Sequence, residues 1–285
     1  MNTDYLKLIR IKVTVLVGLS AFAGACLFSP RLSENHLYGV LAAVLLAAGC
    51  SALNQWQERR EDALMERTQD RPLPSGRMKP EEALMFATII LAVAFTLILR
   101  MKNIPLFASG AAAVFVYNFL YTPMKKQTPF ALMTGSVSGA LPPLIGFFAA
   151  GGSPFDMRIF VVAGILYIWQ TPHFALLSFK YAEDYAKAGF KTLTGTFGEL
   201  KTRKFINVWM SGYATSLFFA IPAGIYLNKP VYFIHAAFAA ATYILFLRFR
   251  ADTDKAFMIL NISIASFFLL LIADRMICSG FNAPF

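Results

Sequence analysis

The sequence contains few charged residues and few cysteines. Only 15% of its 285 residues are charged and 57% are hydrophobic, whereas a soluble globular chain has about 25% charged and about 45–50% apolar residues. This shortage of charge argues against a soluble enzyme, and the apolar content argues against a disordered or fibrous chain. The three cysteines, Cys26, Cys50 and Cys278, lie far apart, which excludes a disulfide framework and a cysteine-cluster metal site.

Cleavage and targeting patterns are also missing near the N-terminus. The first apolar run, residues 11–28, follows the polar residues Asp4, Lys7 and Arg10 and has no small-residue cleavage pattern after it. We therefore expect an uncleaved first span. No Arg/Ser-rich transit peptide precedes it, which favours the cytoplasmic (inner) membrane of a prokaryote. The net charge of +10 then indicates basic loops beside anionic lipid, and we expect no nucleic-acid partner.

Long apolar runs occupy most of the chain. A helix needs about 20 mainly apolar residues to cross the hydrocarbon core of a bilayer. The sequence therefore predicts an all-α, polytopic membrane protein with nine transmembrane helices around a central cavity, in a single domain over residues 1–285. The predicted spans are residues 11–28, 37–53, 83–99, 104–120, 129–150, 159–177, 205–227, 231–247 and 256–273.

The charged residues are distributed unevenly between the two sides of the membrane. With the N-terminus inside, 20 of the 26 Lys and Arg residues lie in inside segments, as the positive-inside rule requires. We therefore predict a cytoplasmic N-terminus. Ten of the 16 acidic residues lie in two inside segments, residues 54–82 and 178–204. Long polar loops are usually functional or disordered, and these are not of low complexity. We predict that both are cytoplasmic active-site loops.

The first motif lies at the inner end of the second span. Asn54, Glu58 and Asp62 are spaced i, i+4, i+8, so a helix places them on one face. Mg²⁺ usually takes one or two carboxylates together with waters and substrate phosphates, so this pattern suits a metal–diphosphate site. On the acids alone, a solvated polar helix with Glu58 and Asp62 paired to Arg59 and Arg60 is an equal alternative.

Two basic motifs add candidate phosphate ligands. Arg67 and Arg71 precede a Pro/Gly turn, and arginine forks bind phosphate oxygens two at a time; for each arginine alone, a positive-inside loop is the alternative. At the inner end of the fourth span, Lys125 can meet a phosphate and Tyr121 can donate a hydrogen bond to it. Taken alone, these two residues are better explained as anchors at the membrane interface.

The third motif spans residues 169–185. His173 lies in the inner part of the sixth span, where a polar residue usually faces a cavity or the bundle interior. It suits contact with a porphyrin metal or propionate, or a hydrogen bond to a neighbouring helix, and both readings stay open. Glu183 and Asp184 are adjacent and point apart on a helix, so we expect only Asp184 to face inward. His36 and His235 lie near the outer edge, and we interpret both as structural.

Taken together, these motifs resemble the intramembrane, UbiA-type prenyltransferases, over nearly the whole chain. The run from Met65 to Leu73, with Arg67, Thr68, Arg71 and Pro72, and the run Trp169-Gln-Thr-Pro-His173-Phe174 are similar to the branch that modifies haem. Two positions depart from the family pattern. Glu58 stands where the family usually has Asp, and the stretch after Gly189 lacks the usual Met-Leu-Pro run.

The resemblance implies a function as well as a fold. It implies Mg²⁺-dependent transfer of farnesyl from farnesyl diphosphate to a vinyl group of haem B, giving the hydroxyethylfarnesyl group of haem O. The alternative acceptor is an aromatic quinone precursor or another tetrapyrrole. A transporter is disfavoured because the mid-span positions are almost free of charge. The implied partners, besides the lipid bilayer, are a haem A synthase or a terminal oxidase assembly.

The same resemblance assigns roles to individual residues. Asn54, Glu58, Asp62 and Asp184 are implied as metal ligands and, with Lys125, as catalytic residues. The implied substrate-binding residues are Arg67, Arg71, Tyr121, His173 and Lys180.

Overall fold

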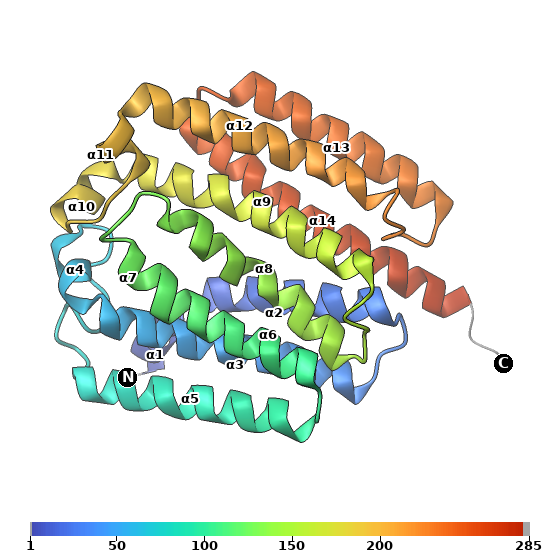
Figure 1. Ribbon diagram of the computed structural model, residues 1–285, viewed down its shortest axis with the longest axis horizontal. Helices are drawn as coiled ribbons and strands as arrows, with labels where there is room; N and C mark the ends of the chain where they lie inside the picture. The colour runs from blue at the N-terminus through green and yellow to red at the C-terminus, as the bar shows by residue number, and fades with distance from the viewer. Residues whose placement is uncertain (1, 282–285) are drawn as a thin grey trace.

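The computed structural model describes residues 2–281, and these residues form helices and connecting turns without any strand (Figure 1). The predicted all-α class is therefore confirmed. The helices are α1 (Asn2–Leu8), α2 (Ile11–Phe28), α3 (Glu34–Gln57), α4 (Arg59–Leu64), α5 (Pro80–Arg100), α6 (Ile104–Val114), the π-helix η1 (Phe115–Tyr121), α7 (Thr122–Met124), α8 (Ala131–Ala149), α9 (Met157–Lys180), α10 (Ala182–Lys187), α11 (Leu193–Phe197), α12 (Glu199–Leu217), the 3₁₀-helix η2 (Phe218–Ala220), α13 (Lys229–Phe249) and α14 (Thr253–Phe281).

Eight helical segments within residues 2–281 are long and apolar enough to cross a membrane, so the chain is a multi-pass membrane protein. They are Ile11–Phe28, Glu34–Gln57, Pro80–Arg100, Ile104–Met124, Ala131–Ala149, Met157–Lys180, Lys229–Phe249 and Thr253–Cys278. The predicted span 205–227 is not among them. Its helix, α12, begins with four charged residues in its first six, and the apolar stretch after it breaks into η2 and a turn. The count of nine therefore stays a prediction.

Close contact between α2 and α8 holds the centre of the bundle. A Cβ atom on Gly24 would lie 2.0 Å from the Pro143 carbonyl oxygen, and one on Gly146 would lie 1.8 Å from that of Ala21. Both distances are far inside van der Waals contact, so only glycine fits at either position. Small residues at such crossings let helix backbones pack directly in a membrane, as the small-residue composition of the fifth span predicts.

A central cavity of about 270 Å³ lies among α2, α3, α6, η1, α8, α9 and α14. Most of its lining is aliphatic or aromatic, with a few polar side chains that include Tyr117, Gln170, His173 and Asn261. The cavity agrees with the prediction of helices arranged around a central cavity.

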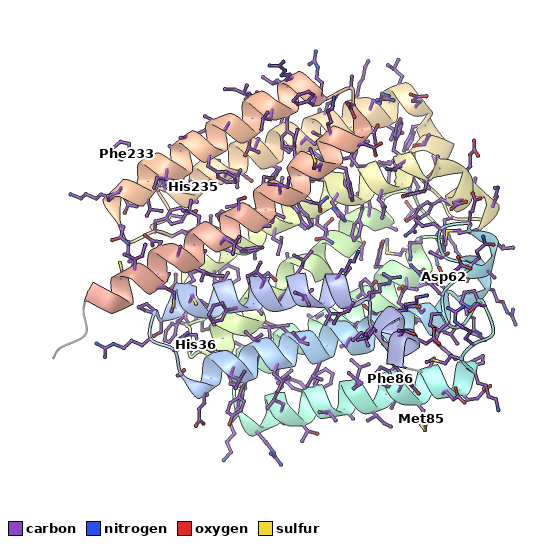
Figure 2. All side chains as sticks on the ribbon, turned by 180° about the vertical axis from the view of Figure 1, so that it is seen from behind. His36, Asp62, Met85, Phe86, Phe233 and His235 are labelled. Atoms are coloured by element: carbon purple, nitrogen blue, oxygen red, sulfur yellow. The ribbon has the colours of Figure 1, made fainter. Side chains whose placement is uncertain are left out.

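The two ends of the bundle differ in composition (Figure 2). Asp62 lies at one end, where α4, α7, α10 and α11 gather, whereas His36 and His235 lie at the other. Both histidines have both ring nitrogens within hydrogen-bond distance of a partner. His36 contacts the Ser33 hydroxyl at 2.9 Å and the Ser29 carbonyl at 3.0 Å. His235 contacts the Tyr226 hydroxyl and the Leu217 carbonyl, each at 2.7 Å. These contacts support the structural interpretation of both residues.

The sides of the bundle expose large apolar residues. Met85 on α5 is 61% exposed and Phe233 on α13 is 78% exposed, and Figure 2 shows both at the periphery. A multi-pass membrane protein presents such side chains to lipid. Phe86, next to Met85, is instead 5.1 Å from the ring of Tyr5 on α1. This contact holds the short first helix against α5.

Candidate active site

Asn54, Glu58 and Asp62 lie together at the polar end of α3. The helix ends at Gln57 and α4 begins at Arg59, yet the i→i+4 backbone bonds continue across the junction: Glu58 N–H to Asn54 at 2.9 Å and Asp62 N–H to Glu58 at 2.8 Å. The three residues are 0%, 4% and 1% exposed. The predicted shared face is therefore confirmed, and the alternative of a solvated helix is wrong because that face is buried.

Each of these three side chains contacts a cation from a different segment. Arg10 donates to Asn54 Oδ1 at 3.0 Å, and Arg71 donates to Asp62 Oδ2 at 2.6 Å. Lys125 forms an ion pair with Glu58. Arg59, which the alternative paired with an acid, donates instead to the Trp56 carbonyl at 2.7 Å. The chain therefore brings three positive groups to one row of oxygen ligands.

Sequence reasoning did not identify Arg10 as a site residue. Its backbone is left-handed, with φ of 50°, a conformation that costs a non-glycine residue of the order of 1–3 kcal/mol. The bend between α1 and α2 turns its side chain to Asn54 and, at 3.2 Å, to the Tyr117 hydroxyl. Its Nε is buried without a hydrogen-bond partner among the described residues. In the sequence Arg10 is only one more basic residue before an apolar run, and no spacing signals its role.

A π-helix positions the residues that face α3. Within η1, Asn118 is fully buried and donates to the Cys50 carbonyl at 3.1 Å and to Gln57 Oε1 at 3.2 Å. Thr122, the first residue after η1, accepts a hydrogen bond from Asn54 at 3.0 Å. π-Helical turns inside α-helices are frequent at functional sites. Here the turn attaches the fourth span to the acid-bearing end of the second.

A series of aromatic rings connects this cluster with the cavity. The Lys125 ammonium lies 4.9 Å from the centre of the Tyr121 ring, and Tyr121 stacks on Phe174 with ring centres 5.5 Å apart. The Phe174 ring lies 5.8 Å from that of His173, and both residues line the cavity. Polar cluster and apolar cavity are therefore adjacent parts of one site.

The segment that carries Asp184 packs against the segment that carries Arg67. Asp184 accepts hydrogen bonds from the backbone N–H groups of Glu66 at 3.3 Å and of Arg67 at 3.1 Å. The Arg67 guanidinium lies 5.2 Å from the Tyr181 ring centre and 5.9 Å from that of Tyr185. Asp184 is buried whereas Glu183 is exposed, so the prediction that only Asp184 faces inward is confirmed.

Lys180 lies outside this cluster. Its ammonium forms an ion pair with the exposed Asp254 at the start of α14 and lies 5.8 Å from the Tyr181 ring centre. Of the ten predicted site residues, it is the one that the structure places at the margin.

The polar cluster is dominated by positive charge. It contains four cations, Arg10, Arg67, Arg71 and Lys125, and three buried carboxylates, those of Glu58, Asp62 and Asp184. Burial lowers the pKa of Lys125, and the attraction of Glu58 opposes this shift. Burial and repulsion from Arg10 lower the pKa of Arg71 to about 10, although Asp62 acts in the opposite direction. Cations that are crowded and desolvated in this way form a binding site for an anion with several oxygens.

Residues 12–272 match the UbiA prenyltransferase family. The chain belongs to this family. It is 40% identical over 218 residues to the protoheme IX farnesyltransferase of Geobacter sulfurreducens, covering 76% of this chain and 80% of that protein. It is 31% identical over 280 residues to the enzyme of the same name from Oleidesulfovibrio alaskensis, covering 96% and 97%.

Solved structures share the fold of this UbiA family member. A structure described as a digeranylgeranylglyceryl phosphate synthase in membranes superposes with a TM-score of 0.77 at 19% identity, covering 96% of this chain and 98% of that one. A UbiA homologue from Archaeoglobus fulgidus bound to GPP and Mg²⁺ gives a TM-score of 0.71 at 18% identity, covering 96% and 99%.

The oxygen ligands of this UbiA family member fit a hard divalent cation. Asp62 Oδ1 is buried and has no hydrogen-bond partner among the described residues, and the carboxylate of Glu58 lies one turn before it. Within residues 2–281, no three Asp, Glu, His or Cys side chains converge into a metal-binding group. Mg²⁺ does not require one, because it usually binds one or two carboxylates and completes its shell with water and substrate phosphate.

Proposed function

We propose that this chain transfers a farnesyl group from farnesyl diphosphate to a vinyl group of protohaem (haem B), giving haem O. The carrying observation is the row of buried side chains Asn54, Glu58 and Asp62, each paired with a cation, next to an apolar cavity. The names of the relatives with which it shares 31–40% identity support haem as the acceptor. We place the reaction in the cytoplasmic membrane, with residues 54–82 and 178–204 forming the active-site segments on the cytoplasmic side.

The polar cluster binds the diphosphate in this proposal. Asn54, Glu58 and Asp62 on one segment and Asp184 on the other would hold Mg²⁺, which would supply Lewis-acid chemistry to the diphosphate oxygens. Arg67, Arg71 and Lys125 place positive charge where the leaving group gains negative charge. Such preorganised charge is usually the largest single contribution to catalysis.

The cavity accommodates the prenyl chain and shields the reacting carbon from water. Phe174 lines the cavity and stacks on Tyr121, and aromatic faces attract cations. We assign to them the stabilisation of the allylic cation that forms when the carbon–oxygen bond of the diphosphate breaks. The aliphatic walls exclude water while that cation exists.

His173 and Lys180 complete the proposed substrate contacts. His173 lines the cavity beside Phe174 and contacts the acceptor. Lys180, at the margin of the cluster, suits a negatively charged group of the porphyrin edge. A haem A synthase or a terminal oxidase assembly is the proposed consumer of the product.

The test is direct. The purified protein in detergent is incubated with haem B, farnesyl diphosphate and Mg²⁺, with and without a chelator, and the haem extract is analysed by liquid chromatography and mass spectrometry. We expect a more hydrophobic haem with the mass of the hydroxyethylfarnesyl product, formed only without chelator. Unmodified haem B together with prenylation of an added phenolic acceptor would instead establish the alternative substrate class.

A further inference from the structure

The three histidines of the chain differ in how their ring nitrogens are satisfied. His36 and His235 have a partner at each nitrogen. The Nδ1 atom of His173 is buried and has no hydrogen-bond partner among the described residues. Buried polar groups without partners are rare because they destabilise the fold. The His173 side chain hydrogen-bonds Asn261 of α14, and Nδ1 is the ring nitrogen left without a partner in a residue that lines the cavity.

Packing holds the His173 ring in place. Its centre lies 4.8 Å from that of Trp169, at an interplanar angle of 32°, and 5.0 Å from that of Phe257, at 30°. Rings on α9 and α14 thus restrict its orientation, and no described residue forms a hydrogen bond with Nδ1. The ring is preorganised, and the buried Nδ1 keeps a lone pair that no described residue uses.

Two amide side chains line the same cavity. Gln170 comes from α9 and Asn261 from α14. A Cβ atom on Gly139 of α8 would lie 2.5 Å from Gln170 Oε1, so the glycine makes room for this amide against the α8 backbone. A buried water needs two to four polar partners. His173, Gln170 and Asn261 are polar groups of the wall of this largely apolar cavity, and the Asn261 Nδ2 already donates to the Phe257 carbonyl at 2.6 Å.

We propose that His173 accepts the proton of the water molecule that completes the reaction; this inference rests on the proposed function. The carbon–oxygen bond of farnesyl diphosphate breaks, and its electron pair leaves with the diphosphate. The terminal vinyl carbon of haem bonds to the farnesyl carbon, which leaves a positive charge on the inner vinyl carbon. Water attacks that carbon, a new carbon–oxygen bond forms, and the water proton passes to His173 Nδ1.

The composition of the cavity wall favours His173 for this step. No Asp, Glu or Lys is among the described residues that line the cavity, and His173 is their one imidazole. The carboxylates of Glu58 and Asp62 belong to the polar cluster and face cations. Tyr117, which also lines the cavity, accepts a hydrogen bond from Arg10. With Nε2 carrying the ring proton, His173 Nδ1 is the proton acceptor in the wall.

The experiment measures which product forms rather than how much. Without a proton acceptor, the positive inner carbon loses a proton from the neighbouring carbon and yields an alkene that is lighter than the alcohol by one water. We expect His173→Asn and His173→Gln to lower the ratio of alcohol to alkene by at least about tenfold, a modest value for general base catalysis. His36→Gln, which alters an imidazole at the far end of the bundle, keeps the wild-type ratio.

Each outcome decides a different point. If the wild-type protein prenylates no haem, the proposed function itself is wrong, whatever the role of His173. An unchanged ratio of alcohol to alkene in both His173 variants overturns the inference. If the visible spectrum of bound haem also shifts in these variants, His173 is an iron ligand instead. If both variants lose all transfer, His173→Ala with added imidazole decides: return of the alcohol supports the inference, and its absence overturns it.

Discussion

At the scale of single residues, the polar end pairs Asn54, Glu58 and Asp62 with one cation each. Asn54, Glu58 and Asp62 were predictable because a helical period of four residues is visible in the sequence. Their partners were less predictable, since Arg10 precedes Asn54 by 44 residues and meets it only through a left-handed bend. Spacing along one helix is local information, whereas the pairing depends on how three segments pack. Sequence therefore predicts which oxygen-bearing side chains share a face better than it predicts the cations that pair with them.

Arg10 is expected to be necessary for prenyl transfer. Arg10→Gln removes the charge near Asn54 and Tyr117, and hydrogen bonds to charged groups contribute about 1.5–3 kcal/mol. We expect kcat/KM for farnesyl diphosphate to fall by about 10- to 100-fold in steady-state assays. Lys12→Gln, which removes an exposed cation two residues later, is the control and should retain wild-type kinetics. Equal effects of the two substitutions would assign only a general electrostatic role to Arg10.

Asp184 and Glu183 offer a second matched pair at this scale. Asp184 accepts hydrogen bonds from the backbone N–H groups of Glu66 and Arg67, and these bonds position the turn that carries Arg67. Glu183 is exposed. Asp184→Ala leaves both donors without this acceptor, and we expect activity to fall by at least about 10-fold, in line with about 1.5–3 kcal/mol for charged hydrogen bonds. We also expect the Mg²⁺ concentration for half-maximal activity to rise. Glu183→Ala should change neither quantity, and a comparable loss in that variant would contradict the assignment.

At the scale of elements, most helices were predictable and two features were not. Apolar runs of about 20 residues gave the spans that surround the cavity, because length and composition suffice for that inference. The expected span 205–227 is divided between α12, η2 and a turn, because the α-helix ends at Leu217, and charged residues precede the run at the start of α12. The π-helix η1 has no sequence signature that we recognise. It depends on the contacts of Asn118 and Thr122 with α3.

The close crossing of α2 and α8 predicts strong sensitivity at one glycine and tolerance at another. Gly146→Ala places a methyl group 1.8 Å from the Ala21 carbonyl oxygen, so the helices must separate. We expect loss of at least about 3 kcal/mol of stability, at the upper end of overpacking effects, seen as a lower unfolding temperature in detergent. Gly164→Ala on α9 meets nothing within 4 Å and should be neutral or stabilising, because alanine favours helix by about 1 kcal/mol. Similar stability of the two variants would disprove the close crossing.

At the scale of the whole molecule, the chain concentrates its chemistry at one end. Asp62 lies at the end where α4, α7, α10 and α11 gather, whereas His36 and His235 lie at the opposite end (Figures 1 and 2). The distribution of Lys and Arg predicted that the polar end is cytoplasmic. The fold shows that this end also adjoins the cavity, because Phe174 lines the cavity and stacks on Tyr121 of the polar cluster. Sequence alone could not reveal this, because the cavity is lined by helices distant in the sequence. A substrate with a charged head and an apolar tail therefore fits the charged cluster and the adjacent apolar cavity.

The orientation of this polar end can be measured by cysteine labelling in intact cells. Cys26 and Cys50 are buried and Cys278 is half-buried, so all three are first replaced by alanine or serine. Single cysteines are then introduced at Lys187, on α10 at the polar end, and at Asn35, at the opposite end; both positions are exposed. With the N-terminus inside, a membrane-impermeant maleimide applied to spheroplasts should label Asn35→Cys and leave Lys187→Cys unlabelled. Permeabilised cells should label both, which controls for reactivity. The reverse pattern would place the diphosphate site outside the membrane, away from the expected positive-inside orientation.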